Sequence, residues 1–355
     1  MTRFKIGAAA LGLVVGVLAA VPAGAWDRGH VDVLTVLPDV TPGVQSSVEG
    51  LTVGPDGNIY VPSFGFNTQG AITTGNAVLF VISPRGDIVR KVTIANSSPH
   101  MLGLAFNPVT GDLWVLDFGA GNVLQVNPMT GVSRVLAGPI ANSGLNALTF
   151  DKDGNGYVSD SFNGVIWKVP PGGGSCTAWS SDPLLGPGTG LTPPFGANGV
   201  EFNNERTILF VANTAFHQII QIPVNKDGTA GTASIFITGI NAPDGIAIDK
   251  QDNFWVCANQ EDDIIVLDKT GKVIAKLGDF NGIDRHGVAR GFLFPASPAF
   301  SLDGKTLYVS NLTLFLPFAG AQAAVDSPWT LEVKHYTVSK LPAVIPPLDG
   351  GDDEH

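Results

Sequence analysis

Cysteine, methionine and charged residues are all scarce in this chain of 355 residues. It has 2 cysteines and 3 methionines, and charged residues make up 14% of the sequence. Cys176 lies in a Gly-rich segment and Cys257 in an apolar run, so the chain has no cysteine framework of the kind that stabilises small secreted domains. A disulfide between the two and a buried, inert Cys257 both remain open. With no neighbouring histidine, the two thiols do not predict a structural zinc site.

Basic residues are few as well, with 20 Lys and Arg against 31 Asp and Glu, which gives a formal charge of −11. A nucleic acid or an anionic membrane surface needs a basic footprint, so we expect neither as a partner. The hydrophobic fraction of 44% excludes a disordered chain. No long apolar run follows residue 25, so we expect no stable membrane insertion of the mature chain.

The long apolar segment that does occur lies at the N-terminus. Arg3 and Lys5 precede an uncharged apolar stretch over residues 6–21, and residues 23–25 (Ala-Gly-Ala) supply small side chains at a cleavage position. This pattern predicts a secretory signal peptide over residues 1–25 and an exported protein, periplasmic or extracellular. An uncleaved membrane anchor is the alternative.

Glycine and proline are abundant, at 44 and 25 residues, about a fifth of the chain. Both residues break helices, so this content excludes a helical bundle and favours short strands joined by tight turns.

One pattern recurs six times: a strand with alternating apolar residues, a turn rich in Asp, Asn and Gly, and a second, apolar strand. The copies begin at Glu49, Leu102, Asn146, Asn198, Asp244 and Ala296, which we call the ring positions; they lie 53, 44, 52, 46 and 52 residues apart. Each copy predicts a hairpin, and further strand-like runs lie between copies. Three or four strands per unit at a period near 50 is typical of a β-propeller blade.

Six copies predict an all-β, six-bladed β-propeller that forms a single ring-closed domain over residues 26–340, because one blade cannot bury both faces of its sheet alone. Residues 30–36 read as a strand that pairs with residues 331–338 and closes the ring. Residues 341–355, Pro-rich and then acidic, predict a surface extension or a disordered tail. Two smaller domains are the alternative, but no linker interrupts the repeats.

The ring positions begin the strand that lies nearest the central channel of a propeller, so their side chains should surround one mouth of that channel. Four of them carry side-chain oxygens: Glu49, Asn146, Asn198 and Asp244. Carboxylate and amide oxygens without histidine or thiolate favour a hard divalent cation, calcium before magnesium or manganese. The alternative is that Asn and Asp begin these strands as turn formers, which does not account for Glu49.

Four segments resemble the SMP-30/gluconolactonase/LRE-like six-bladed propellers: Val48-Glu49-Gly50, Leu145-Asn146-Ala147, Asn198-Gly199-Val200 and Pro243-Asp244-Gly245-Ile246. The resemblance covers essentially the whole mature chain. It implies a calcium-dependent lactonase that opens a lactone or ester ring with metal-activated water. Glu49, Asn198 and Asp244 would hold one divalent cation, most often Ca²⁺, with Mg²⁺, Mn²⁺ or Zn²⁺ as alternatives. Asn146 would be a fourth ligand or a substrate contact, and Asp244 the general base.

Two further positions bear on the substrate. Sugar-lactone members of that family carry a basic residue two positions before the counterpart of Asn146, and this chain has Gly144 there. With apolar loops over residues 182–194 and 317–329 that could cap the channel, Gly144 predicts a substrate less polar than gluconolactone. His100 lies two residues before a ring position and is a candidate base or substrate contact. A loop histidine bonded to the backbone is the alternative.

Two other functions fit the same fold. One is a non-catalytic propeller that binds a ligand or protein and uses a cation only for rigidity. The other is a lyase or synthase, as in the strictosidine-synthase-like propellers. Fold alone does not choose among them. The oxygen-bearing ring positions, and the lack of a Gly-x-Ser-x-Gly nucleophile motif in the sequence, favour a metal-dependent hydrolase.

Overall fold

The computed structural model describes residues 29–72, 75–188, 195–319 and 326–345. The predicted signal peptide over residues 1–25 lies outside these ranges. Within them, none of the helices has both the length and the apolar character that a membrane span requires.

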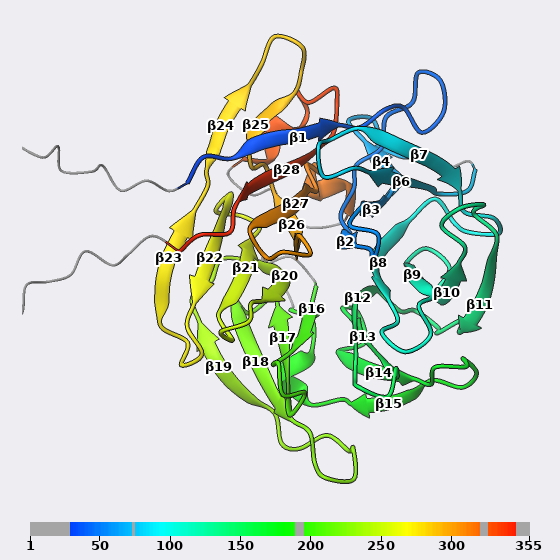
Figure 1. Cartoon of the computed structure of the whole chain (residues 1–355), viewed down its shortest axis with the longest axis vertical. Helices are drawn as coiled ribbons and strands as arrows, with labels where there is room; N and C mark the ends of the chain where they lie inside the picture. The colour runs from blue at the N-terminus through cyan, green and yellow to red at the C-terminus, as the bar shows by residue number, and fades with distance from the viewer. Residues whose placement is uncertain (1–28, 73–74, 189–194, 320–325, 346–355) are drawn as a thin grey trace, which may run out of the picture.

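The described chain forms six four-stranded antiparallel sheets arranged in a ring, which confirms the predicted all-β, six-bladed propeller (Figure 1). Blades one to three comprise β2 (Thr52–Val53), β3 (Ile59–Pro62), β6 (Val78–Ile82) and β7 (Ile88–Thr93); β8 (Met101–Phe106), β9 (Leu113–Asp117), β10 (Asn122–Val126) and β11 (Ser133–Ala137); and β12 (Leu145–Phe150), β13 (Gly156–Asp160), β14 (Val165–Val169) and β15 (Thr177–Ser180). The first strand of each blade is the innermost, as predicted.

Blades four to six complete the ring. They comprise β16 (Ala197–Phe202), β17 (Ile208–Asn213), β18 (Gln218–Pro223) and β19 (Ser234–Thr238); β20 (Pro243–Ile248), β21 (Phe254–Ala258), β22 (Asp263–Leu267) and β23 (Val273–Leu277); and β26 (Pro295–Phe300), β27 (Thr306–Asn311), β28 (Thr337–Pro342) and β1 (Asp32–Val36). The second strands are buried along their length because neighbouring blades cover both faces, which explains their unbroken apolar runs. The outer strand β7 instead alternates between half-buried and exposed residues.

The ring closes between the two ends of the propeller. β1 pairs antiparallel with β28, with Asp32 opposite Lys340 and Val36 opposite Thr337. The N-terminal strand is therefore the closing strand, as predicted, but its partner begins six residues later than residues 331–338. The reason is that α1 (Ser327–Thr330) occupies the preceding segment and His335 bridges to Val288 instead.

The predicted boundary of the C-terminal tail at residue 341 is too early. Leu341 lies within β28 and is buried in a core cluster, and Ala343 and Ile345 pack against the same cluster. The Pro-rich sequence suggested a tail from residue 341. Pro342 is instead the last residue of β28, and Leu341 before it packs in the core. The acidic end, residues 346–355, lies outside the described residues.

Glycine at the residue after a ring position allows the inner strands to approach one another closely. A Cβ atom on Gly50, Gly103, Gly199 or Gly245 would overlap the backbone at the ring position of the next blade: Leu102, Asn146, Asp244 and Ala296, respectively. The Asn-Gly and Asp-Gly pairs in the sequence therefore have a packing role at the centre of the ring, in addition to any role of their side chains.

We expect Gly199→Ala to destabilise the protein by about 1–3 kcal/mol, the usual cost of overpacking a rigid interior. The added methyl group meets the Asp244 carbonyl and the Gly245 backbone, which cannot rotate away as a flexible side chain would. Chemical denaturation of the variant measures the loss. Gly172→Ala is the matched control, because a Cβ atom there meets nothing within 4 Å. Equal free energies of unfolding for the two variants would contradict this account.

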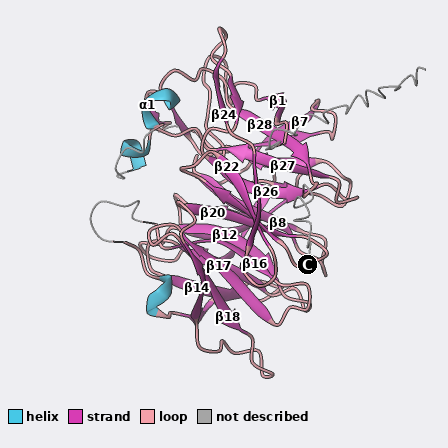
Figure 2. Cartoon of the chain, turned by 90° about the vertical axis from the view of Figure 1, so that its left-hand side faces the viewer, coloured by secondary structure: helices cyan, strands magenta, loops and turns pink. Residues whose placement is uncertain are grey.

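Two hairpins and three short helical segments of the described chain lie outside the blade sheets. The hairpins, β4 (Phe66–Asn67) with β5 (Gly70–Ala71) and β24 (Phe280–Ile283) with β25 (Ala289–Gly291), extend from the ring. The helical segments η1 (Pro183–Leu185), η2 (Leu316–Ala319) and α1 lie together on one face of the ring (Figure 2). That face carries the cavity described next.

Candidate active site at the channel mouth

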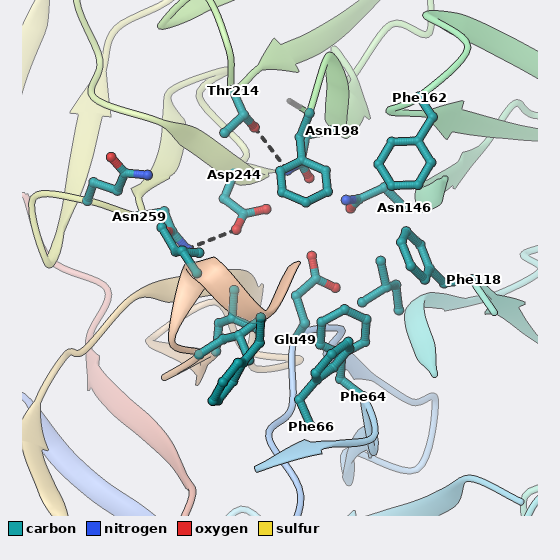
Figure 3. Close-up of a pocket in the computed structure, with 17 residues that line it drawn as sticks. Glu49, Phe64, Phe66, Phe118, Asn146, Phe162, Asn198, Thr214, Asp244 and Asn259 are labelled. Carbon is teal, nitrogen blue, oxygen red and sulfur yellow. Dashed lines mark hydrogen bonds between the residues drawn. The ribbon is translucent and has the colours of Figure 1, made fainter. Parts of the chain in front are cut away.

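A cavity of about 220 Å³ opens at one mouth of the central channel. Its polar lining consists of Glu49, Asn146, Asn198, Thr214, Asp244, Asn259 and Gln260. Its apolar lining, which we call the apolar wall, consists of Phe64, Phe66, Leu102, Phe118, Phe162, Phe195, Leu312, Leu314, Leu316 and Phe318. The carboxylates of Glu49 and Asp244 point into the same space, beside Asn146 and Asn198, and phenylalanine rings surround them (Figure 3).

A bulge in five of the six inner strands directs ring-position side chains into the channel. In β12, β16 and β20 the register with the second strand shifts just around the ring position, for example between Ala197 and Val200 and between Pro243 and Ile246. β8 and β26 have the same shift. An extra residue in one strand of a pair re-aims its side chain. Asn198 and Asp244 therefore face the cavity. With regular pairing, their side chains would instead follow the alternation between the two faces of the strand.

The two carboxylates in the cavity are almost entirely buried, with 4% of Glu49 and 5% of Asp244 exposed. Burial raises the pKa of Glu49 well above its usual range, and the neighbouring Asp244 carboxylate raises it further. Burial also raises the pKa of Asp244 to about 8, although the amides of Asn198 and Asn259 act in the opposite direction. Of the described residues that line the cavity, none is Lys, Arg or His. Nothing in that lining balances the two negative charges.

Three oxygens of the predicted ligand set are buried without a hydrogen-bond partner among the described residues: Glu49 Oε2, Asn198 Oδ1 and Asp244 Oδ1. Leaving such atoms unpaired costs about 1–3 kcal/mol each, more when they are charged. A divalent cation would satisfy all three and balance the two carboxylates, and oxygen donors suit a hard ion. The residues present therefore fit a divalent cation.

The donor set is poor in the usual metal-binding residue types. In the part of the chain that the structure describes, His, Cys, Asp and Glu side chains form no group of three that could hold a metal. A cation here would rely on the amide oxygen of Asn198, with Asn146 as a further donor, beside the carboxylates of Glu49 and Asp244. Such a mixed carboxylate and amide set is typical of calcium rather than zinc.

Hydrogen bonds from the next shell hold two of these side chains. Thr214 Oγ1 accepts a hydrogen bond from Asn198 Nδ2 at 3.0 Å and donates one to Pro243 O at 2.8 Å. Asn259 Nδ2 donates to Asp244 Oδ2 at 3.0 Å and to Pro295 O at 3.2 Å. The polar side of the cavity is thus a connected network, with the three unpartnered oxygens as its open ends.

The structure brings five of the six ring positions to this cavity, including Asn146, the predicted fourth ligand or substrate contact. The exception is Ala296, which is buried in a core cluster with Leu102 and Phe64. The predicted capping loops contribute in part. Phe318 of the second loop lines the cavity, next to Leu316, which precedes that loop, whereas residues 189–194 and 320–325 lie outside the described residues.

His100 does not have the position that a catalytic base would need. It is absent from the described lining of the cavity, and its Nδ1 lies 2.7 Å from Phe64 O. Its ring packs beside Phe66, with 4.8 Å between ring centroids, and Phe64 and Phe66 supply the cavity surface there. His100 as a base or a substrate contact therefore stays a prediction that this geometry does not favour. The alternative, a histidine bonded to the backbone, is what the structure shows.

Gly144, the other position predicted to bear on the substrate, also lies outside the described lining of the cavity. A Cβ atom at Gly144 would lie 2.8 Å from Phe162 Cγ, which means that the phenyl ring rests directly on the Gly144 backbone. Phe162 does line the cavity. The space that a side chain at position 144 would use is therefore filled by an apolar ring from the turn after β13.

Sequence reasoning missed a second set of lining residues, which we call the second column. It consists of the residue three positions after the valine of each second strand: Phe64, Phe118, Ser161, Thr214, Asn259 and Leu312. All of them except Ser161 line the cavity. The signal was available, because the same alignment that gave the ring positions also aligns these residues. Their mixed chemistry, apolar in three blades and polar in three, concealed the shared place.

Comparisons with known proteins agree with this geometry. Residues 193–278, which include Asn198 and Asp244, match the model of the SMP-30/gluconolactonase/LRE-like region. The chain is a six-bladed propeller that contains an SMP-30/gluconolactonase/LRE-like region. This family's region coincides with blades four and five, whose ring positions supply two of the three unpartnered oxygens.

Among curated proteins, the chain is similar to the lactonase drp35 of Staphylococcus epidermidis, with 24% identity over 239 residues, 52% of this chain and 71% of that protein. Among solved structures it is similar to a gluconolactonase from Xanthomonas campestris (TM-score 0.57, 14% identity, 84% of this chain and 86% of that one). It is also similar to regucalcin from Agrobacterium tumefaciens, a calcium-binding protein (TM-score 0.58, 17% identity, 87% and 94%). At these identities the structural likenesses show the fold.

Proposed function

We propose that this protein is a divalent-metal-dependent hydrolase that opens a lactone or related ester ring, with a substrate less polar than gluconolactone. One observation carries the proposal: three unpartnered buried oxygens, from Glu49, Asn198 and Asp244, lie in a cavity whose remaining lining is mostly phenylalanine and leucine. Such an arrangement offers a cation site next to a binding surface for an apolar molecule. The similarity to curated lactonases supports the same reaction class.

Glu49, Asn198 and Asp244 would hold the cation, with Asn146 as a fourth ligand, and calcium suits these donors best. When bound, a divalent cation polarises a lactone carbonyl and makes water a stronger nucleophile at neutral pH. The carboxylates of Glu49 and Asp244 also make the electrostatic potential of the site negative. Two buried negative charges favour a divalent cation and disfavour an anionic substrate.

Asp244 is the general base of the proposed reaction. Its Oδ2 is held by Asn259 Nδ2, whereas Oδ1 would contact the cation with one lone pair and accept a proton from the attacking water with the other. The water oxygen bonds to the carbonyl carbon, the ring C–O bond breaks, and the proton passes from Asp244 Oδ1 to the departing ring oxygen. The product is a hydroxy acid, and Asp244 returns to its starting state. No nucleophilic side chain is consumed.

The apolar wall would bind the part of the substrate that does not react. Phe64, Phe118, Phe162 and Phe195 form a continuous arc with ring centroids 5.8, 5.5 and 5.7 Å apart in succession. Leu312, Leu314 and Leu316 face the cavity from the last blade. A sugar lactone would leave its hydroxyls against these rings without hydrogen-bond partners, which is costly, whereas an alkyl or other apolar substituent gains from leaving water.

Hydrolysis of a lactone panel tests the proposed function. We expect γ- and δ-lactones with alkyl chains to exceed gluconolactone in kcat/KM. Each buried methylene adds about 0.8 kcal/mol, close to fourfold. A chelator should abolish the activity and Ca²⁺ should restore it. A preference for gluconolactone would contradict the assignment of the substrate, and full activity in chelator would contradict the assignment of the metal.

Phe162→Ala provides the site-specific arm of this panel. It removes the ring that rests on Gly144 and should reduce kcat/KM for alkyl lactones more than for gluconolactone. Phe216→Ala is the matched control, because Phe216 is half exposed and lies outside the described lining of the cavity. An equal effect of both substitutions on the alkyl-lactone preference would show that the apolar wall does not set specificity.

A further inference from the structure

Polar residues of the second column connect neighbouring blades at the channel mouth. In blades three, four and five the side chain donates a hydrogen bond to the carbonyl that precedes the ring position of the next blade. The three bonds are Ser161 Oγ to Ala197 O (2.7 Å), Thr214 Oγ1 to Pro243 O (2.8 Å) and Asn259 Nδ2 to Pro295 O (3.2 Å). In blades six, one and two the same column carries Leu312, Phe64 and Phe118, which can make no such bond.

The bonds of Thr214 determine which way the Asn198 amide faces. A threonine hydroxyl has one hydrogen, and Thr214 uses it on the buried Pro243 carbonyl. Its oxygen can then only accept, so the group of Asn198 that faces it must be the NH₂ and not the carbonyl oxygen. The Asn198 Oδ1 is consequently directed away from Thr214, and it is one of the three oxygens without a partner.

The bonds of Asn259 act on the Asp244 carboxylate in the same way. Both hydrogens of its NH₂ group are used, one on Asp244 Oδ2 and one on Pro295 O. The Pro295 carbonyl belongs to the backbone of β26, so it anchors the amide, and the amide fixes the carboxylate. Asp244 Oδ1 is left as the open oxygen. Thr214 and Asn259 are themselves buried, so water does not compete for these bonds.

We propose that Thr214 and Asn259 are positioning residues that orient Asn198 and Asp244 so that each presents one oxygen to a divalent cation. The inference rests on the proposed function for the existence of the cation, and goes beyond it in assigning the residues that preorganise the site. The Asn198 amide already lies close enough to Asp244 to lower the pKa of that carboxyl. Without Thr214, its NH₂ group can turn fully toward the carboxylates, so that Oδ1 no longer faces a cation. Outer-shell partners of this kind typically change metal affinity by about 10–100-fold.

Ser161 supplies a control from the same column. It is buried and donates to the equivalent backbone carbonyl, Ala197 O, but no described hydrogen bond joins its side chain to a ring-position side chain. Removing its hydroxyl therefore costs an interblade hydrogen bond without freeing a ligand. Thr214 and Ser161 differ in the one feature that the proposal requires.

The experiment is a calorimetric titration of the chelator-treated full chain with Ca²⁺. We expect Thr214→Val, which keeps the shape and loses the hydroxyl, to weaken Ca²⁺ affinity by about 10–100-fold. Thr214→Ser should restore it to near the wild-type value. Ser161→Ala should keep wild-type affinity while lowering the melting temperature in chelator. Asn259→Leu, the residue that blade six has at this position, should weaken affinity as Thr214→Val does.

The outcomes separate this inference from the proposed function. Wild-type Ca²⁺ affinity in both Thr214→Val and Asn259→Leu would overturn the positioning role and leave the metal-dependent hydrolase standing. An equal loss in Ser161→Ala and Thr214→Val would show a general structural effect and overturn it too. A wild-type chain that binds no Ca²⁺, Mg²⁺, Mn²⁺ or Zn²⁺ would overturn the cation itself, and with it the metal dependence of the proposed function.

Discussion

Asp244→Asn is expected to lower kcat for lactone hydrolysis by about 10²–10⁴-fold, the usual effect of removing a general base. The amide keeps the size of the side chain and one oxygen, but it cannot take a proton from water. The Asn259 NH₂ group now donates to Asp244 Oδ2 and would attract the single remaining oxygen. The variant should therefore also bind Ca²⁺ more weakly, so kcat must be measured at saturating Ca²⁺ to isolate the proton transfer.

Asp249→Asn is the matched control for this substitution. Asp249 lies in the turn between β20 and β21 of the same hairpin and accepts hydrogen bonds from Gln251 N and Asn253 N. Its replacement by Asn keeps the acceptor for these two donors but loses the one for Asn253 Nδ2 and Trp255 Nε1, so we expect lower stability with near wild-type hydrolysis in the folded protein. If Asp244→Asn turned over a good lactone as fast as wild type at saturating Ca²⁺, Asp244 would not be the base, and Glu49 would be the carboxylate left to test.

Glu49→Gln should have opposite effects on stability with and without Ca²⁺. In chelator at pH 8 we expect the variant to be more stable than wild type. It removes one of two buried carboxyl groups, and the charge of one increases the free energy needed to ionise the other. When the pKa of a carboxyl group is higher in the folded state than in the unfolded state, the free energy of unfolding falls as the pH rises past the unfolded-state pKa. The free energy of unfolding of the cation-free wild type should therefore fall from about pH 4.5 towards pH 8, and that of the variant should fall less.

With Ca²⁺ present the order should reverse. A ligand at 100 times its Kd stabilises the folded state by about 2.7 kcal/mol, and the variant, with one ligand charge removed, should gain little of this. Thermal unfolding across pH, with chelator and with Ca²⁺, measures both effects. A Glu49→Gln protein that is stabilised by Ca²⁺ as strongly as wild type would exclude Glu49 as a ligand.

The repeats made the architecture and the ring positions predictable from the sequence. A blade repeats the same strand, turn and strand with little variation in length, so aligning the copies also aligns their positions in the ring. That is why Glu49, Asn146, Asn198 and Asp244 could be placed at one channel mouth before any coordinates, and they do line one cavity. An apolar lining was also expected, from Gly144 and the apolar loops over residues 182–194 and 317–329, and not from Phe64, Phe118 and Phe162.

Only the tertiary structure decided which other side chains share the cavity. His100 lies two residues from a ring position, yet the rings of Phe64 and Phe66 separate it from the cavity surface. Position 144 is covered by Phe162, which comes from a different strand connection. These outcomes depend on contacts between segments whose separation in the chain varies, and a repeat alignment does not encode them.

The orientation of the unpartnered oxygens of Asn198 and Asp244 has the same origin. The sequence determined that an Asn and an Asp stand at the ring positions of blades four and five, because the repeat fixes the backbone there. Which oxygen each one presents follows from Thr214 and Asn259, which donate to carbonyls of the next blade, Pro243 and Pro295. Those hydrogen bonds exist only once the blades have closed into a ring. The sequence therefore placed the donors, and the closed ring directed them.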